Sequence, residues 1–158
     1  MGRDSQSGMQ KVLIVDDSAT NRQMLGDLLQ SEYSVLLGKN GEEGLDLAQE
    51  HIPDVILLDV IMPDLDGYEV LRKLKEDVRT SSICVVFLTG LDTPEAEERG
   101  LSEGASDYVT KPFHPTVVKA RVALHMQVVR QRRMLETLAN IDGLTELPNR
   151  RQFDAVFS

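Results

Sequence analysis

Short runs that are apolar almost throughout alternate along this chain with segments of helical periodicity, and this alternation restricts the possible folds most. The expected strands are Lys11–Val15, Tyr33–Leu37, Asp54–Leu58, Ile83–Leu88 and Asp107–Thr110. Helices are expected over 18–31 and 40–50, from the residue after the capping Asp66 to 77, over 94–103 with Pro94 at the first helical position, and from Pro115 onward. Strands that are apolar throughout are buried on both faces, which implies a parallel sheet covered by helices on each side. We therefore predict an α/β fold: a doubly wound (βα)5 unit with strand order 2-1-3-4-5 and an extended C-terminal helix.

The charge of the chain is unevenly distributed. Residues 1–113 contain 10 Lys and Arg against 22 Asp and Glu, whereas residues 114–158 contain 7 against 4. So acidic a first part is a poor binder of nucleic acid, and no DNA binding is expected. The longest apolar run, Ile83–Leu88, is too short to span a membrane, and the single cysteine, Cys84, fits a reducing compartment. We expect a cytoplasmic protein without membrane contact.

Polar residues with carboxylate, hydroxyl or ammonium groups follow four of the five expected strands. They are Asp16 and Asp17, Asp59, Thr89, and Lys111. Because the strands are parallel, their carboxyl ends meet at one edge of the sheet. Three carboxylates that share a pocket repel one another, and Mg²⁺, which prefers oxygen ligands, relieves that repulsion. The cluster therefore predicts a Mg²⁺ site that handles phosphate.

Asp59 is the expected nucleophile, because it ends the central strand and lies between the other strand ends. An ionised aspartate can attack phosphorus and form an aspartyl phosphate. Lys111 and Thr89 would then neutralise the oxygens of the transferred group. Each residue also has a purely structural explanation, such as helix capping by Asp16 and Asp17. The occurrence of all of them together, at the ends of the strands, favours a functional site.

Four segments of the sequence carry a family resemblance. They are 12–18 (VLIVDDS), 59–67 (DVIMPDLDG), 87–90 (FLTG) and 104–113 (GASDYVTKPF). Together they closely resemble response-regulator receiver domains over residues 10–126, which implies the flavodoxin-like receiver fold. The resemblance implies that Asp59 accepts a phosphoryl group from a phosphohistidine on a sensor histidine kinase or a phosphotransfer protein.

The resemblance also implies a set of metal ligands. Asp17 and Asp59 would bind Mg²⁺ directly, and Asp16 would act through a bound water. The backbone carbonyl of Ile61 would complete the ligands from the protein.

A switch pair follows from the same resemblance. On phosphorylation Thr89 would move toward the phosphoryl group, and Tyr108 would turn inward. The Lys111–Pro112 peptide bond is expected to be cis, in keeping with the rule that cis peptides are mainly a property of X-Pro bonds.

The last expected helix is unusually long, because nothing interrupts it from Thr116 to Asn140. Residues recur at heptad spacing in two sets: Val117, Leu124, Gln131 and Leu138, and Arg121, Val128 and Leu135. Heptad spacing favours a dimer-forming coiled coil over the linker 127–141, although Arg121 and Gln131 weaken the seam. A single solvated linker helix is the alternative. The expected homodimer would use the helix over 94–103, the strand Asp107–Thr110, the last helix and the linker.

Both ends of the chain carry further expectations. Residues 138–153 (LANIDGLTELPNRRQF) resemble the opening of GGDEF domains, which are diguanylate cyclases, with Glu146 at a position where Gly is common. The resemblance implies that 142–158 are the truncated start of such a domain, and a short helical tail is the alternative. Residues 1–9 are expected to be a disordered tail or a remnant of cloning.

The expected function is that of a receiver whose phosphorylation controls dimerisation and a C-terminal output. This chain would accept a phosphoryl group without catalysing cyclic di-GMP synthesis, because the GGDEF signature itself is missing. One alternative is a Mg²⁺-dependent phosphatase, but such enzymes often have a second Asp where this chain has Ile61. The other is a phosphorylation-independent interaction module with the receiver fold, which the retained acidic cluster and Lys111 disfavour.

Overall fold

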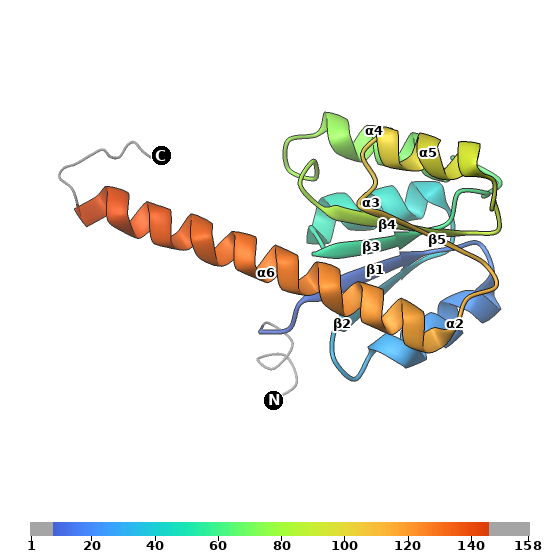
Figure 1. The fold of residues 1–158 in the computed structure, drawn as a ribbon, viewed down its shortest axis with the longest axis horizontal. Helices are drawn as coiled ribbons and strands as arrows, with labels where there is room; N and C mark the ends of the chain where they lie inside the picture. Colours follow the sequence, from blue (N-terminus) through green and yellow to red (C-terminus); the bar gives the residue numbers. More distant parts are fainter. Residues whose placement is uncertain (1–7, 146–158) are drawn as a thin grey trace. The chain divides into compact units, whose positions relative to one another are not determined.

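A computed structural model describes residues 8–145, in which five strands alternate with five helices (Figure 1). The strands are β1 (Lys11–Val15), β2 (Ser34–Gly38), β3 (Val55–Leu58), β4 (Cys84–Thr89) and β5 (Asp107–Thr110). The helices are α2 (Ala19–Leu29), α3 (Gly41–His51), α4 (Gly67–Glu76), α5 (Pro94–Ser102) and α6 (Pro115–Thr145). The predicted N-terminal tail before residue 8 and the GGDEF-like segment beyond Thr145 lie outside the described residues.

All neighbouring strands of the sheet are parallel, and their order is β2-β1-β3-β4-β5. This arrangement confirms the predicted α/β fold and strand order. Strands β3 and β4 are buried at every position, as their sequences, apolar up to Leu58 and Leu88, predict. The helices α3, α4 and α5 cover one face of the sheet, and α2 and the first turns of α6 cover the other (Figure 1).

Side-chain caps fix where the helices begin, and the caps predicted before α4 and α5 are present. Ser18 precedes α2 and accepts a hydrogen bond from the Asn21 N–H at 3.3 Å. Before α4, Asp66 and Glu69 form a reciprocal capping box. A capping residue stays extended while its side chain satisfies a free N–H of the first turn, so the helix starts one residue beyond it.

Alternate residues of the central strands contribute to the two sides of the core. Leu13, Val15, Ile56 and Leu58 belong to one buried apolar cluster, together with Phe87 and residues of α4. Because side chains of a strand alternate between faces, the intervening residues of β1 and β3 are buried toward the opposite layer. The sheet is therefore covered on both sides, and its carboxyl edge is where polar side chains can gather.

Helix α6 ends at Thr145, five residues beyond the predicted end at Asn140. Gly143 lies inside it, and a single glycine costs a helix about 1 kcal/mol relative to alanine without ending it. The chain divides into two compact units, of which the first ends at Ala123 and the second begins at Leu124. Within residues 8–145, no helix combines the length and apolar character that crossing a membrane requires.

Candidate functional site

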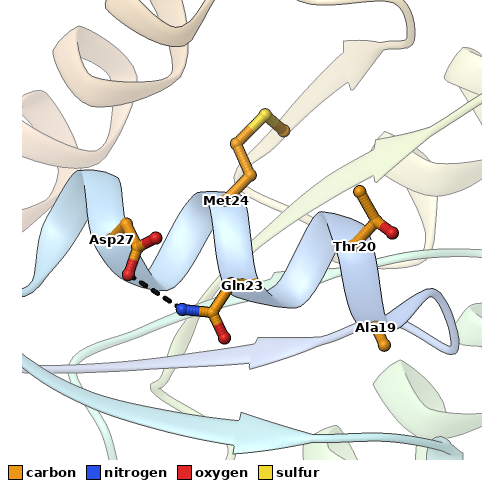
Figure 2. Close-up of a pocket in the computed structure, with 5 residues that line it drawn as sticks. All are labelled: Ala19, Thr20, Gln23, Met24 and Asp27. Atoms are coloured by element: carbon orange, nitrogen blue, oxygen red, sulfur yellow. Dashed lines mark hydrogen bonds between the residues drawn. The ribbon is translucent and has the colours of Figure 1, made fainter.

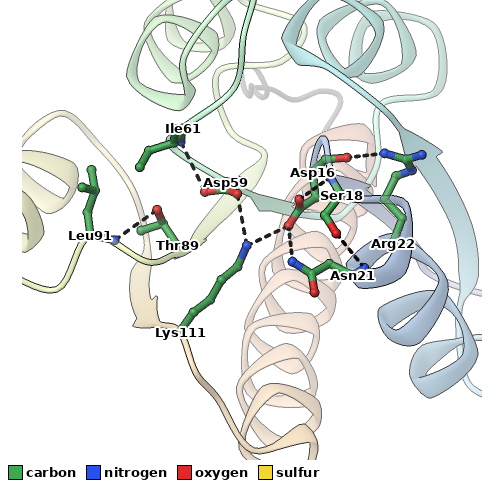
Figure 3. Close-up of polar contacts among 9 residues, drawn as sticks. All are labelled: Asp16, Ser18, Asn21, Arg22, Asp59, Ile61, Thr89, Leu91 and Lys111. Atoms are coloured by element: carbon green, nitrogen blue, oxygen red, sulfur yellow. Dashed lines mark hydrogen bonds and ion pairs between the residues drawn. The ribbon is translucent and has the colours of Figure 1, made fainter.

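Polar residues predicted from the strand ends meet at the carboxyl edge of the sheet (Figure 3). Carboxylate oxygens of Asp16, Asp17 and Asp59 all lie within 4.8 Å of one another. Asp16 and Asp59 are buried, whereas Asp17 is exposed to solvent. The parallel topology thus brings together two strand ends that are more than forty positions apart in the sequence.

Lys111 reaches this cluster from the end of β5. Its Nζ donates to Asp16 Oδ2 at 3.0 Å and to Asp59 Oδ2 at 3.1 Å. Burial alone would lower the pKa of Lys111, but its contacts with Asp16 and Asp59 outweigh that effect and the net pKa is raised. The ammonium therefore stays charged beside both carboxylates. The Lys111–Pro112 peptide bond is cis, as predicted.

The first turn of α2 fixes the orientation of Asp16. The Ser18 N–H donates to Asp16 Oδ1 at 2.9 Å, and Asn21 Nδ2 donates to Oδ2 at 3.4 Å. Arg22 Nη1 donates to the Asp16 carbonyl at 2.6 Å. Sequence reasoning missed Asn21 and Arg22, although their place one turn after the acidic pair, on a helix that starts at the same edge, is a usable signal.

Asp59 is held by backbone contacts on both sides. Its N–H donates to the Val15 carbonyl at 3.0 Å, which continues the ladder between β3 and β1. The Ile61 N–H donates to Asp59 Oδ1 at 3.3 Å, while the Ile61 side chain is 59% exposed. The Asp59 carboxylate is thus oriented by its own loop and by Lys111.

The donor set fits a hard divalent cation. Three carboxylates and one ammonium leave an excess of negative charge at a single edge. Mg²⁺ takes oxygen ligands, commonly one or two carboxylates with waters and phosphate oxygens. The cluster supplies the oxygen ligands that such a cation requires, in keeping with the Mg²⁺ site that the sequence predicts.

Thr89 and Tyr108 meet at the backbone of one residue, Leu91. The Leu91 N–H donates to Thr89 Oγ1 at 3.4 Å, and the Tyr108 hydroxyl donates to the Leu91 carbonyl at 2.8 Å. Both side chains are buried, so Tyr108 already lies inward in this structure. Burial raises the pKa of Tyr108 and keeps its hydroxyl protonated, as a donor must be.

Aromatic contacts extend from Tyr108 across the sheet to α4. The Phe87 ring lies edge-on to Tyr108 at 5.9 Å and to Tyr68 at 5.5 Å between centroids. Tyr68 in turn donates its hydroxyl to the Ala96 carbonyl in α5 at 3.2 Å. Two tyrosine hydroxyls therefore hold the segment from Leu91 into α5, a link that the sequence pattern did not predict.

A separate depression lies on the surface of α2 (Figure 2). It is lined by Ala19, Thr20, Gln23, Met24 and Asp27. All five come from one helix, and the carboxylate of Asp27 already accepts a hydrogen bond from Gln23 Nε2 at 3.0 Å. Its lining offers no second charged group, so the edge of the sheet remains the candidate site.

Comparisons with known proteins agree with this geometry. Residues 12–123 match the family model described as the response regulator receiver domain. The chain is 43% identical over 113 residues to Response regulator PleD of Caulobacter vibrioides, covering 71% of this chain and 25% of that protein. It is 38% identical over 124 residues to a Vibrio cholerae protein named "Probable cyclic di-GMP phosphodiesterase", covering 78% and 28% respectively.

A solved structure of the Vibrio cholerae chemotaxis protein CheY4 superimposes with a TM-score of 0.70 at 34% identity. The match covers 73% of this chain and 98% of that one. This chain spans only about a quarter of the length of PleD and of the named phosphodiesterase, so the likeness to them concerns one domain. Family match, strand order and acidic edge agree, and the chain belongs to the response regulator receiver family.

Proposed function

We propose that this chain accepts a phosphoryl group on Asp59, in a Mg²⁺-dependent reaction with a phosphohistidine of a sensor histidine kinase or phosphotransfer protein. The observation that carries the proposal is the cluster of Asp16, Asp17 and Asp59 with Lys111 shared between two of them. A purely structural ion pair would need one carboxylate for this ammonium. The excess carboxylates support a site for a cation and phosphate.

The transfer forms an acyl phosphate. A carboxylate oxygen of Asp59 attacks phosphorus, the bond from phosphorus to the donor imidazole breaks, and its electron pair leaves on the imidazole nitrogen. Lys111 Nζ, 3.1 Å from Asp59 Oδ2, would pair with a phosphoryl oxygen as negative charge moves onto that group. Asp17, Asp59, Asp16 through water and the Ile61 carbonyl would hold Mg²⁺, which supplies neutralisation of the phosphoryl oxygens.

Thr89 and Tyr108 are proposed to report the modification. Rotation of Thr89 toward the phosphoryl group would break its contact with the Leu91 N–H and replace it with a stronger charge-assisted hydrogen bond. Phosphorylation would thereby select the arrangement in which Tyr108 holds the Leu91 carbonyl. The segment leading into α5 would then populate its conformations differently in the phosphorylated and the unphosphorylated protein.

The test of this function is phosphoryl uptake from a small acyl-phosphate donor, followed by intact mass. We expect one phosphoryl group per chain in the presence of Mg²⁺ and none when a chelator removes the cation. Uptake that is equal with and without the chelator would overturn the role of the metal. No uptake from either the small donor or a phosphorylated histidine kinase would favour a phosphorylation-independent interaction module.

The acyl phosphate is expected to be long-lived. Ile61 and Leu91, two residues beyond Asp59 and Thr89, have no group that can orient an attacking water. We predict that Ile61→Asn or Leu91→Glu shortens the phosphoryl lifetime roughly tenfold by supplying such a group. The decay of phosphorylated protein after removal of the donor measures it, with Ile61→Val as the apolar control. Equal lifetimes for Ile61→Asn and Ile61→Val would contradict this account.

We further propose that phosphorylation promotes a homodimer through α5, β5, α6 and the linker. Within α6, the heptad positions Leu124, Val128, Leu135 and Leu138 are exposed by between 49% and 67% of their surface. Such a row of exposed apolar side chains fits the seam of a two-stranded coiled coil, and a second copy of this helix matches its spacing.

Leu135→Glu should weaken that dimer at least tenfold, because it places two like charges at one seam layer and removes two buried leucines. Light scattering over a concentration series of the phosphorylated protein measures the effect. Thr137→Glu is the matched control, since Thr137 is exposed on α6 away from the seam. Equal weakening by both variants would argue against the seam and for a solvated linker helix.

In a longer protein we propose that the output is a diguanylate cyclase. The support is the sequence of residues 138–153, which resembles the opening of GGDEF domains. Cyclic di-GMP synthesis joins two GTP molecules, so a dimer that pairs two active sites would couple phosphorylation to output. Assaying the full-length gene product for cyclic di-GMP synthesis and hydrolysis decides between a cyclase and a phosphodiesterase.

The proposed location of the protein is the cytoplasm.

A further inference from the structure

The loop between β3 and α4, residues 59–66, is tied to a distant helix by one carboxylate. Asp64 Oδ1 accepts the Gly41 N–H at 2.9 Å, and Asp64 Oδ2 accepts the Glu42 N–H at 2.8 Å. Both donors belong to the first turn of α3, where N–H groups lack partners within the helix. Asp64 lies 23 residues after Gly41 and 22 residues after Glu42 in the sequence.

Helix α3 does not depend on this link for its capping, because it has a cap of its own. The Asn40 side chain accepts the Glu43 N–H at 2.8 Å, as an N-cap residue ordinarily does. Asp64 is therefore a second, non-local partner of the same helix end. Its main consequence falls on the loop that carries it.

The loop and α3 are packed too closely to move independently. A Cβ built on Gly41 would lie 2.6 Å from the Leu65 carbonyl oxygen and 2.8 Å from the Leu65 Cβ. Burial alone would raise the pKa of Asp64, but its backbone hydrogen bonds from Glu42 and Gly41 outweigh that and lower it. The carboxylate is thus ionised and in close contact with the helix end.

The same loop carries the groups that orient the acceptor. Ile61 lies three residues before Asp64, and its N–H donates to Asp59 Oδ1 at 3.3 Å. At the far end of the loop the Gly67 N–H donates to the Val60 carbonyl at 2.8 Å. The loop is therefore closed at its base, and Asp64 anchors it between these two points.

We infer that Asp64 is a positioning residue for the acceptor site: by anchoring the loop to α3, it fixes Ile61 against Asp59 and in place for the metal. This inference rests on the proposed function, which assigns the Ile61 carbonyl to Mg²⁺. Partners that orient metal ligands from outside the coordination sphere change metal affinity by about 10–100-fold when they are removed.

The experiment compares Asp64→Ala with Asn40→Ala in the whole chain, because each removes one partner of the same helix end. Calorimetric titration with Mg²⁺ gives the Kd, and urea unfolding gives the stability. We expect similar falls in the urea midpoint for both variants. The Kd should rise about tenfold in Asp64→Ala and less than twofold in Asn40→Ala. Asp64→Asn should lie between wild type and Asp64→Ala, because its carbonyl oxygen can still accept one N–H.

Amide hydrogen exchange at Ile61 provides a readout that does not need the metal. We expect faster exchange there in Asp64→Ala than in Asn40→Ala. An unchanged Kd in Asp64→Ala, or equal changes in both variants, would overturn the positioning role. If wild type binds no Mg²⁺, the proposed function fails, and the exchange rates alone decide whether Asp64 orders the loop.

Discussion

Asp59→Asn should abolish phosphoryl uptake from both the small donor and a histidine kinase, with no residual incorporation at Mg²⁺ saturation. An amide has no ionised oxygen that can attack phosphorus, so the acyl phosphate does not form. The fold should survive, because an asparagine carbonyl can still accept the hydrogen bond that Lys111 Nζ makes at 3.1 Å. Intact mass of the acid-labile adduct measures the loss.

Two further variants make this result specific. Asp27→Asn, on the surface of α2, removes a carboxylate outside the cluster and should leave uptake unchanged. Asp17→Asn keeps the acceptor but removes a proposed metal ligand. Phosphoryl uptake should therefore fall at the Mg²⁺ concentration used for wild type and should recover at a higher Mg²⁺ concentration. Incorporation in Asp59→Asn at the wild-type level would assign the phosphoryl group to another residue and overturn the proposed role of Asp59.

Gly67→Ala should lower the free energy of unfolding by about 2 kcal/mol, within the range for overpacking a closed site. A Cβ at Gly67 would lie 2.5 Å from the Asp59 carbonyl oxygen, 2.8 Å from Val60 Cα and 2.9 Å from Phe87 Cε1. Two of these atoms are backbone, so the end of β3 has to move. Because that backbone carries the acceptor, phosphoryl uptake should slow as well.

Gly90→Ala is the matched control for this substitution. Gly90 also lies at the carboxyl edge, after Thr89, but a Cβ there meets no atom within 4 Å. Its stability should stay within about 0.5 kcal/mol of wild type, as for most surface changes. Urea unfolding of the two variants measures the difference. Equal urea midpoints for the two variants would show that the loop after β3 can shift to accommodate the added Cβ without loss of stability.

The order of elements and the meeting of the acidic residues could be predicted from the sequence. Apolar runs such as Val55–Leu58 are buried on both faces, and such strands form a parallel sheet. Parallel strands present their carboxyl ends at one edge, so Asp16, Asp59 and Lys111 had to approach one another. These inferences need only local pattern and topology. The long α6 was predicted from its uninterrupted pattern, and in the structure it continues five residues past Asn140 to Thr145.

Only the tertiary structure decided the contacts between residues that lie far apart in the sequence and follow no periodic pattern. The sharing of Lys111 between two carboxylates, the hydroxyl of Tyr108 on the Leu91 carbonyl, and the anchor of Asp64 on α3 are of this kind. Each depends on side-chain rotamers and on how closely two elements pack, which a pattern of apolar positions does not encode. The sequence by itself therefore determined which groups gather at the edge of the sheet, and packing determined how those groups are oriented toward one another.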